Sequence, residues 1–413
     1  MSWTPPPPPP WLVRMNRLAA AAGGAEHLVG LDPDALIAEA IATTGHDDFG
    51  ADDFRTPLRV LLEAAEREAA LTVAGRLITR TEVLRLLRNR LRLVAWQRAE
   101  PAAAAAPVEA PIVIVGTARS GTSILHELLA CDPDTRTPAT WEVMYSTPPP
   151  EAATYASDPR IAVADAEVTW WHDLAPSYVA MHENGGRHPQ ECIFLMAHAF
   201  QSNHFAGVLD VPTYTRWMAA SDMGPAYRIH RALLQCLQSR HRLARWVLKA
   251  PSHLGTLAAL FAVYPDARIV LTHRDPKKTL PSTISLLATL RAMRSDRVDV
   301  PAIARGTAAG VATLLERMIA MRADGRLPES QFIDVAYADL MSRPLETLAA
   351  LYPRLGLDLT PAARERMTAH LTARPRGQHG PHRYDLADFG FTAAEVDRLY
   401  APYLTRFAIA PEG

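Results

Sequence analysis

The sequence lacks the features that would tie it to an oxidising compartment, a membrane or a nucleic acid. Its three cysteines among 413 residues, Cys131, Cys192 and Cys236, lie too far apart for a metal motif or a disulfide framework. Basic residues number 43 and acidic residues 44, so no excess charge favours a polyanion. No apolar run reaches the roughly 18 residues of a transmembrane helix. We expect a cytoplasmic protein without nucleic-acid binding or stable membrane insertion; no oligomeric state is indicated.

The first quarter of the chain predicts helices rather than a site. Residues 1–25 form a Pro/Ala-rich arm that begins with an extended run, Pro5 to Pro10, and lacks the pattern of a signal peptide. Residues 26–110 predict a helical region and a connector. Asp32 can cap a helix, and Pro33 suits its first position. No polar cluster is apparent here, so we expect these helices to serve as packing support.

Residues 111–413 predict an α/β domain with a P-loop-like parallel sheet. Four short apolar runs each precede a helical pattern or a loop: 111–115, 246–248, 268–273 and 331–336. Strands that alternate with helices indicate a parallel sheet with helices on both faces. The stretch 137–242 has no strand pattern and is rich in tryptophan, methionine and phenylalanine. It predicts a helical insertion, or lid, over the active site.

The loop after the first predicted strand has the glycine spacing of a P-loop. It reads Gly116-Thr-Ala-Arg-Ser-Gly-Thr-Ser123, and its backbone amides and helix dipole can hold an anion. Thr122 stands where a nucleoside triphosphate-binding loop has lysine, and the cation comes earlier, as Arg119. This pattern disfavours transfer from a metal–nucleoside triphosphate.

The run 111–129 closely resembles the 5′-phosphosulfate loop of sulfotransferases that use 3′-phosphoadenosine-5′-phosphosulfate (PAPS). Many bacterial members have Arg-Ser-Gly-Thr at this point, whereas animal cytosolic members have Lys-Ser-Gly-Thr. The resemblance implies that Arg119 stabilises the bridging oxygen of the donor. It also implies that amides or hydroxyls of the next four residues bind the phosphosulfate: Ser120, Gly121, Thr122 and Ser123.

Two further segments resemble the donor site of the same family over roughly residues 30–400. The segment 269–282 is similar to its 3′-phosphate site, which implies that Arg274 and Ser282 hold that phosphate. A guanidinium at a strand end and a hydroxyl on the next helix suit a phosphate monoester. The segment 374–384 resembles the carboxy-terminal loop that closes over the donor, although it departs from the Arg-Lys-Gly of cytosolic members. The residues implied there are Arg374, Arg376 and Gly377.

Sulfuryl transfer to an acceptor, with release of 3′-phosphoadenosine-5′-phosphate (PAP), needs a base but no metal. Glu142 lies after the helix that follows the loop, where related bacterial and heparan-type enzymes place a glutamate. His253 ends a Lys-x-Pro-x-His segment similar to one in the bacterial and lipid-type branch. Glu191 and His182 are further candidates. Lys249, one of only three lysines, is expected to assist the leaving group or position the acceptor.

Two other functions remain as alternatives. A P-loop-type small-molecule kinase would share the fold, but Thr122 and the order Arg274-Asp275 argue against the required lysine and magnesium ligand. An inactive nucleotide- or lipid-binding protein is the second alternative. Under the main hypothesis, the apolar insertion predicts a small-molecule or lipid acceptor with a hydroxyl or amine.

Overall fold

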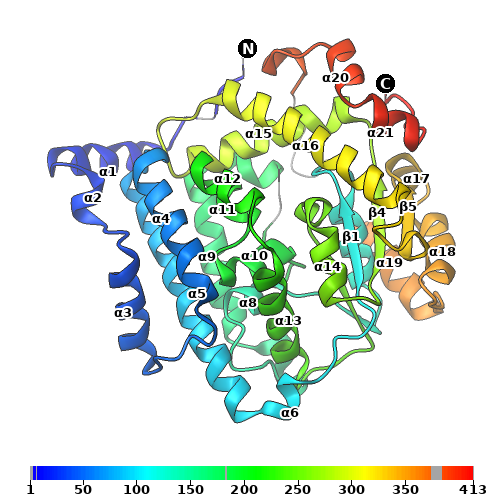
Figure 1. Cartoon of the computed structure of the whole chain (residues 1–413), viewed down its shortest axis with the longest axis horizontal. Coiled ribbons are helices and arrows are strands. Elements are labelled where there is room, and N and C mark those ends of the chain that lie inside the picture. The colour runs from blue at the N-terminus through cyan, green and yellow to red at the C-terminus, as the bar shows by residue number, and fades with distance from the viewer. Residues whose placement is uncertain (1–2, 6, 182–183, 374–383, 413) are drawn as a thin grey trace.

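The computed structural model describes residues 3–5, 7–181, 184–373 and 384–412 (Figure 1). At its centre lies a five-stranded parallel sheet in the order β2-β3-β1-β4-β5. Four strands confirm the predicted ones: β1 (Ile112–Gly116), β3 (Arg245–Lys249), β4 (Arg268–His273) and β5 (Phe332–Ala336). The fifth, β2 (Thr135–Arg136), was not predicted, because two residues are too few to show a strand pattern.

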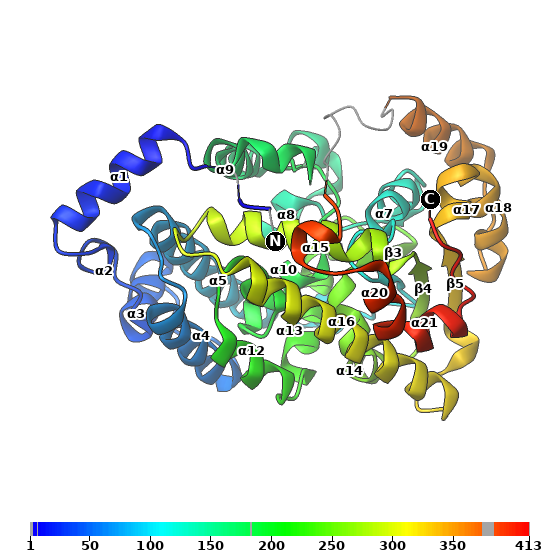
Figure 2. The same ribbon diagram turned by 90° about the horizontal axis from the view of Figure 1, so that it is seen from above.

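Helices cover both faces of the sheet, as predicted, because every strand is buried and its side chains alternate between two cores. On β1, Ile112 and Ile114 pack against α7 (Thr122–Ala130), α18 (Pro344–Arg354) and α19 (Pro361–Ala373). Val113 and Val115 face the other core, with α13 (Gly224–Gln238), α14 (Leu257–Val263) and α16 (Val300–Ala323). Figure 2 shows these two helical layers on opposite sides of the strands.

The amino-terminal helices pack in a core that they share with residues 197–218 of the insertion. Asp32 accepts a hydrogen bond from the backbone N–H of Ala35 at 2.8 Å, and Pro33 begins the helix, so the predicted cap is confirmed. The helices of this region are α1 (Pro10–Ala21), α2 (Ala25–Leu28), α3 (Pro33–Thr44), α4 (Arg55–Glu68), α5 (Val73–Ala99) and the short α6 (Pro101–Ala104). The predicted arm therefore turns helical immediately after its prolines.

The predicted insertion is helical in its described part and lies between the amino-terminal helices and the sheet (Figure 1). Besides α13 and short 3₁₀ segments it contains α8 (Thr140–Met144), α9 (Arg160–Leu174), α10 (Cys192–Met196), α11 (Asn203–Val208) and α12 (Pro212–Ala219). The chain after β4 adds α15 (Pro276–Ala292), α17 (Tyr337–Ser342), α20 (Ala393–Leu399) and α21 (Ala401–Arg406).

Parallel pairing brings the ends of the central strands to one edge of the sheet. Ile114 of β1 is in register with Lys249 of β3, and Gly116 of β1 is in register with Thr272 of β4. The loops that follow these strands therefore meet at this edge, which is where α/β folds bind ligands. Among the described helices, none combines the length and apolar character needed to cross a bilayer.

Candidate active site

The loop between β1 and α7 needs its glycines for backbone reasons. Gly121 has a φ of +90°, and a Cβ there would lie 2.9 Å from the ring of Tyr337. A Cβ on Gly116 would lie 2.3 Å from Oγ1 of Thr272. Arg119 also has a positive φ, of 68°, which is uncommon for a residue other than glycine. Because α7 begins directly after Gly121, the unpaired amides of its first turn adjoin this loop.

Three residues predicted to hold the donor come together although 155 positions separate the two arginines. Nε of Arg119 donates to Oγ of Ser282 at 3.0 Å. Nη1 of Arg274 donates to the backbone carbonyl of Arg119 at 2.8 Å. Nη1 of Arg119 also donates to the carbonyl of Met181 at 2.8 Å. Two guanidinium groups and a hydroxyl are thus gathered around this loop, which suits a ligand with several anionic oxygens.

The guanidinium of Arg274 already has a carboxylate partner. Glu412, near the carboxyl end of the chain, accepts from its Nε at 2.9 Å and from its Nη2 at 3.0 Å. The guanidinium also lies 3.8 Å from the centre of the Tyr337 ring, which follows β5. The Nε and Nη2 groups of Arg274 are therefore already engaged by an anion.

Lys249 forms an ion pair with Glu191 beside the same loop. The Lys249 side chain is almost fully buried, and its Nζ lies 2.5 Å from Oε1 of Glu191 and 3.3 Å from Oγ of Ser123. Glu191 comes from the insertion, immediately before α10, whereas Ser123 lies in the first turn of α7. A cation and a carboxylate thus lie together next to the loop that is predicted to bind the phosphosulfate.

Glu142 has a different environment. Its side chain is fully buried, and one oxygen pairs with the buried guanidinium of Arg136. The other accepts from the backbone N–H of Ala139 at 2.9 Å and from the hydroxyl of Tyr155 at 3.0 Å. The structure does not bring this carboxylate into contact with Arg119 or Lys249. Its surroundings are those of an internal ion pair, which does not favour Glu142 as the base.

His253 lies in the 3₁₀ segment η5 (Pro251–Gly255) behind the strand end, with a 1% exposed side chain. Its Nδ1 lies 2.7 Å from the hydroxyl of Tyr227, and its Nε2 is buried without a hydrogen-bond partner. Burial lowers the pKa of His253 to about 4. The ring is therefore neutral at pH 7 and packed in the core, whereas its neighbours Pro251 and Ser252 line a cavity.

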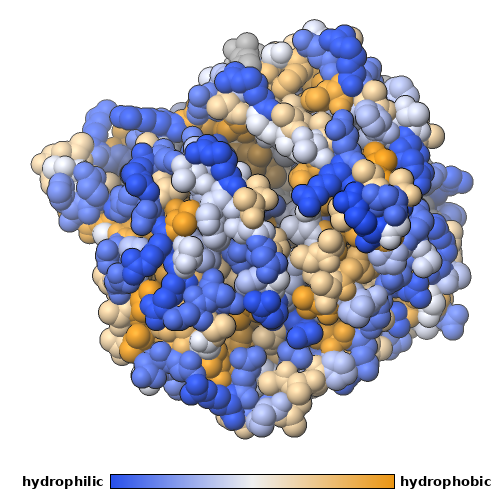
Figure 3. All heavy atoms as spheres, in the orientation of Figure 1, coloured by the Kyte–Doolittle hydropathy of each residue, from blue (hydrophilic) through white to orange (hydrophobic). Residues whose placement is uncertain are grey.

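This cavity, called here the acceptor cavity, has a volume of about 420 Å³ and begins at the phosphosulfate loop. Gly116, Thr117 and Glu191 line its polar end. The rest is mainly apolar and comes from α10, α11, α15 and α16, with Phe194, Val208, Leu287, Leu290, Val311 and Leu314 among its lining residues. Figure 3 shows a hollow with an orange, hydrophobic interior on the face where α11 and α16 lie.

A family model described as the sulfotransferase family matches residues 111–361, more than half of the chain. The chain belongs to the sulfotransferase family. Crystal structures of two members cover most of it. Sulfotransferase STF1 of Mycobacterium tuberculosis H37Rv is 34% identical, with a TM-score of 0.78, over 89% of this chain and 98% of that one. STF9 of Mycobacterium avium is 26% identical, with a TM-score of 0.82, over 92% and 97%.

Two curated mycobacterial sulfotransferases are also similar. Both are omega-hydroxy-beta-dihydromenaquinone-9 sulfotransferase Stf3, from Mycobacterium bovis and Mycobacterium tuberculosis. Each is 26% identical over 258 residues, which is 60% of this chain. The match spans only 63% of the length of these relatives.

Several residues of this sulfotransferase site were missed or only weakly indicated by the sequence. Tyr337 directly follows β5, and a rule that examines strand ends would have found it. Glu412 has no local signal, because its role depends on the return of the chain to Arg274. Ser120 was predicted at the donor, but its buried hydroxyl bonds within the scaffold to Thr272 at 2.7 Å. The predicted His182, Arg374, Arg376 and Gly377 lie outside the described residues.

Proposed function

We propose that this enzyme transfers the sulfuryl group of PAPS to a hydroxyl, or an amine, of an apolar small-molecule or lipid acceptor and releases PAP. One observation carries the proposal. Arg119, Arg274 and Ser282, which suit several phosphate oxygens, lie at the same sheet edge as the Lys249–Glu191 pair. Glu191 lines the polar end of the apolar acceptor cavity. Family membership supports sulfuryl transfer, and the donor and the acceptor class are inferred from these groups.

The donor end follows from the charges present. The amides at the start of α7, with Gly121, Thr122 and Ser123, hold the phosphosulfate, and the Arg119 guanidinium neutralises charge on it. Arg274 and Ser282 hold the 3′-phosphate, for which Glu412 leaves the guanidinium. Since a carboxylate already satisfies Arg274, the exchange replaces one anion by another and leaves no buried cation unpaired.

We assign the base to Glu191 rather than to Glu142 or His253. The acceptor oxygen attacks sulfur, the bond between sulfur and the PAP oxygen breaks, and Glu191 takes the acceptor proton. Lys249 lies between Glu191 and Ser123, so a small movement of its ammonium from the carboxylate towards the leaving oxygen stabilises PAP and makes Glu191 more basic.

The acceptor end is apolar apart from the groups at the loop. An acceptor with a hydrophobic body and one nucleophilic oxygen or nitrogen suits this lining. The curated relatives are named for a hydroxylated menaquinone derivative, which is a lipid-like acceptor of this kind. The resemblance supports the class of acceptor and not that particular molecule.

The test combines donor binding with turnover. In calorimetry with a metal chelator present, we expect PAP to bind to the wild type and Glu191→Gln with similar affinity. Transfer of labelled sulfate from PAPS to a panel of apolar alcohols should fall by about 10²- to 10⁴-fold in Glu191→Gln, the usual contribution of a general base. PAP binding without transfer to any acceptor would favour the inactive binding protein. Binding of ATP that requires magnesium would favour the kinase.

A further inference from the structure

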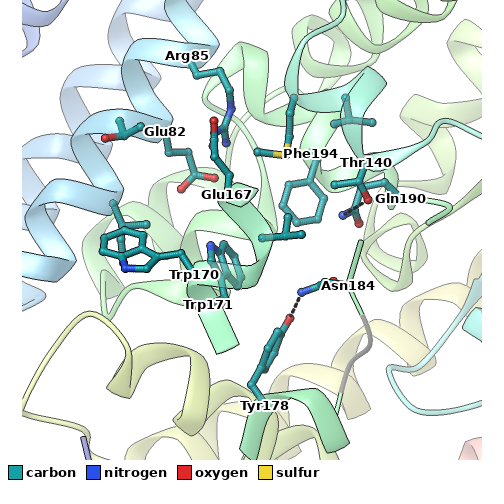
Figure 4. Close-up of a pocket in the computed structure, with 15 residues that line it drawn as sticks. Glu82, Arg85, Thr140, Glu167, Trp170, Trp171, Tyr178, Asn184, Gln190 and Phe194 are labelled. Carbon is teal, nitrogen blue, oxygen red and sulfur yellow. Dashed lines mark hydrogen bonds and ion pairs between the residues drawn. The ribbon is translucent and has the colours of Figure 1, made fainter. Parts of the chain in front are cut away.

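A second cavity of about 240 Å³ lies between the amino-terminal helix α5 and the insertion (Figure 4). Helices α5, α8, α9 and α10 all contribute to its lining. It is called here the distal cavity. No sequence pattern indicates this cavity, because its lining joins α5 to residues far along the chain.

The distal cavity adjoins the acceptor cavity. Trp171, Tyr178, Gln190 and Phe194 line both. Gln190 directly precedes Glu191, the proposed base, so the two cavities meet beside the reacting groups. Since Trp171 and Phe194 are only partly buried, rotation of their side chains can open a passage between the cavities.

The lining of the distal cavity changes from apolar to charged. Its middle is aromatic and aliphatic, with Trp170, Trp171 and Phe194 around it in Figure 4. On one side the figure shows Arg85, whose Nη1 lies 2.5 Å from Oε2 of Glu167. The hydroxyl of Tyr145 also donates to Glu167. This pair is partly accessible, because the Arg85 side chain is 18% exposed and that of Glu167 34% exposed.

Glu82 adds a fixed negative charge to the same side. It pairs with His204 at 2.6 Å and lies 3.7 Å from the guanidinium of Arg294. Although burial alone would raise its pKa, these two neighbours lower the pKa of Glu82 to about 2. A ligand that reaches this side of the cavity therefore meets ionised hydrogen-bonding groups after an apolar stretch.

We propose that the distal cavity is a second compartment of the acceptor site, which takes the far end of an elongated acceptor with a hydrogen-bonding group there. The proposal rests on the proposed function, because it places the reacting hydroxyl at Glu191 and Lys249. The apolar middle of the acceptor passes Trp171 and Phe194, and its far polar group reaches the Arg85–Glu167 pair.

Straight-chain primary alcohols and α,ω-diols of matched and increasing length are suitable probes. They are titrated calorimetrically into PAP-saturated protein and assayed as acceptors of labelled sulfate. For the wild type we expect affinity to rise about fourfold for each further methylene buried, up to the length that fills both cavities. At that length the diol should bind about tenfold or more tightly than the alcohol, because its second hydroxyl meets charged partners.

Two variants separate the parts of the proposal. Thr81→Trp places a large side chain at an exposed position of the distal lining, and it should remove the gain for long probes while short alcohols react as before. Leu77→Trp adds the same residue to an exposed α5 position outside this lining and is the matched control. Arg85→Met should abolish the preference for the diol and keep the dependence on length.

The outcomes distinguish this proposal from the proposed function. If Thr81→Trp and Leu77→Trp respond identically to probe length, the second compartment is refuted, even if sulfate transfer continues. If long diols bind to the wild type in a manner sensitive to Thr81→Trp but no sulfate is transferred, the compartment stands and the sulfotransferase assignment fails. If the Arg85→Met protein still prefers diols, the proposal that Arg85 binds the far polar group of the acceptor is refuted.

Discussion

The phosphosulfate loop occupies the consecutive residues 116–123, whereas the acceptor cavity beside it is lined by residues that range from Gly116 to Leu314. On the donor side, cations and amides are placed by one loop and one strand end. On the acceptor side, α10, α11, α15 and α16 each supply between one and three apolar side chains. Under the proposed function, anion binding is thus a local property of this chain, while acceptor recognition is a property of helix packing.

Two glutamates of the insertion, the buried Glu142 and the exposed Glu151, sharpen this comparison most. Glu142→Gln should lower the free energy of unfolding by about 3–5 kcal/mol, because it leaves the buried Arg136 guanidinium without its carboxylate. The measurement is urea denaturation. Protein that remains folded should still bind PAP.

Glu151→Gln is the control for this change. Glu151 pairs with Arg240 at 2.7 Å, but both side chains are about half exposed, so the effect should stay below about 1 kcal/mol. If Glu142→Gln were as stable as the wild type and yet lost turnover, the base would be Glu142. A buried residue of the insertion would then take part in catalysis.

Donor binding gives the next largest effect. Arg274→Ala should weaken PAP binding by about 10- to 150-fold, the equivalent of one lost charge-assisted contact worth about 1.5–3 kcal/mol. Adenosine-5′-phosphosulfate, which has no 3′-phosphate, should lose less. Glu412→Gln should act in the opposite direction, because the 3′-phosphate no longer competes with a carboxylate for the guanidinium. Calorimetry with both nucleotides measures these changes.

Ser282→Ala is a second test of the same site. It is needed because Arg274 also donates to the backbone carbonyl of Arg119, so Arg274→Ala also loosens the loop. The serine variant removes only a hydroxyl, so a selective loss of PAP binding would place the 3′-phosphate there. Equal losses for both nucleotides in Arg274→Ala and Ser282→Ala would contradict the assignment of the 3′-phosphate. Residues outside the segment 269–282 would then have to bind that phosphate.

The smallest effect concerns pH. Burial lowers the pKa of His253 to about 4, so this ring binds a proton more readily in the unfolded chain. Its contribution to stability is therefore present above the unfolded pKa of about 6.5 and is lost as the pH falls towards 4. His253→Asn should reduce the slope of stability against pH in this window by up to about 1.4 kcal/mol per pH unit. Urea denaturation at several pH values measures this slope.

The pH dependence of turnover should differ from the pH dependence of stability. If the imidazole of His253 is a core group, the pH profile of turnover should keep its shape in His253→Asn. An inflection near pH 6.5 that disappears in this variant would identify the histidine as the base, and η5 would then belong to the reacting groups rather than to the scaffold.

Much of the donor side could be predicted from single segments. Gly116, Gly121 and Arg119 lie on a loop between a strand and a helix, and the glycine spacing of that loop is readable from the sequence alone. Only the left-handed φ of Gly121 is a local reason for glycine, because the side chains that a Cβ at Gly116 or Gly121 would meet, Thr272 and Tyr337, come from distant segments. The cluster of Arg274 and Ser282 follows from a parallel sheet, in which consecutive strand ends meet at one edge. The environment of Glu142 could not be predicted, because its place in the sequence after the loop helix does not reveal that the side chain turns inwards to Arg136.

The sequence by itself determined the four long strands, the glycine-bearing loop 116–123 and the arginines that follow two strand ends, since backbone sterics, alternating burial and glycine spacing act over a few residues. Only the tertiary structure decided which carboxylate meets Lys249, that Glu412 returns to Arg274, and that α5 closes a second cavity beside the first. Those contacts join segments tens to hundreds of residues apart, and the packing of whole helices, rather than any local pattern, sets their distances.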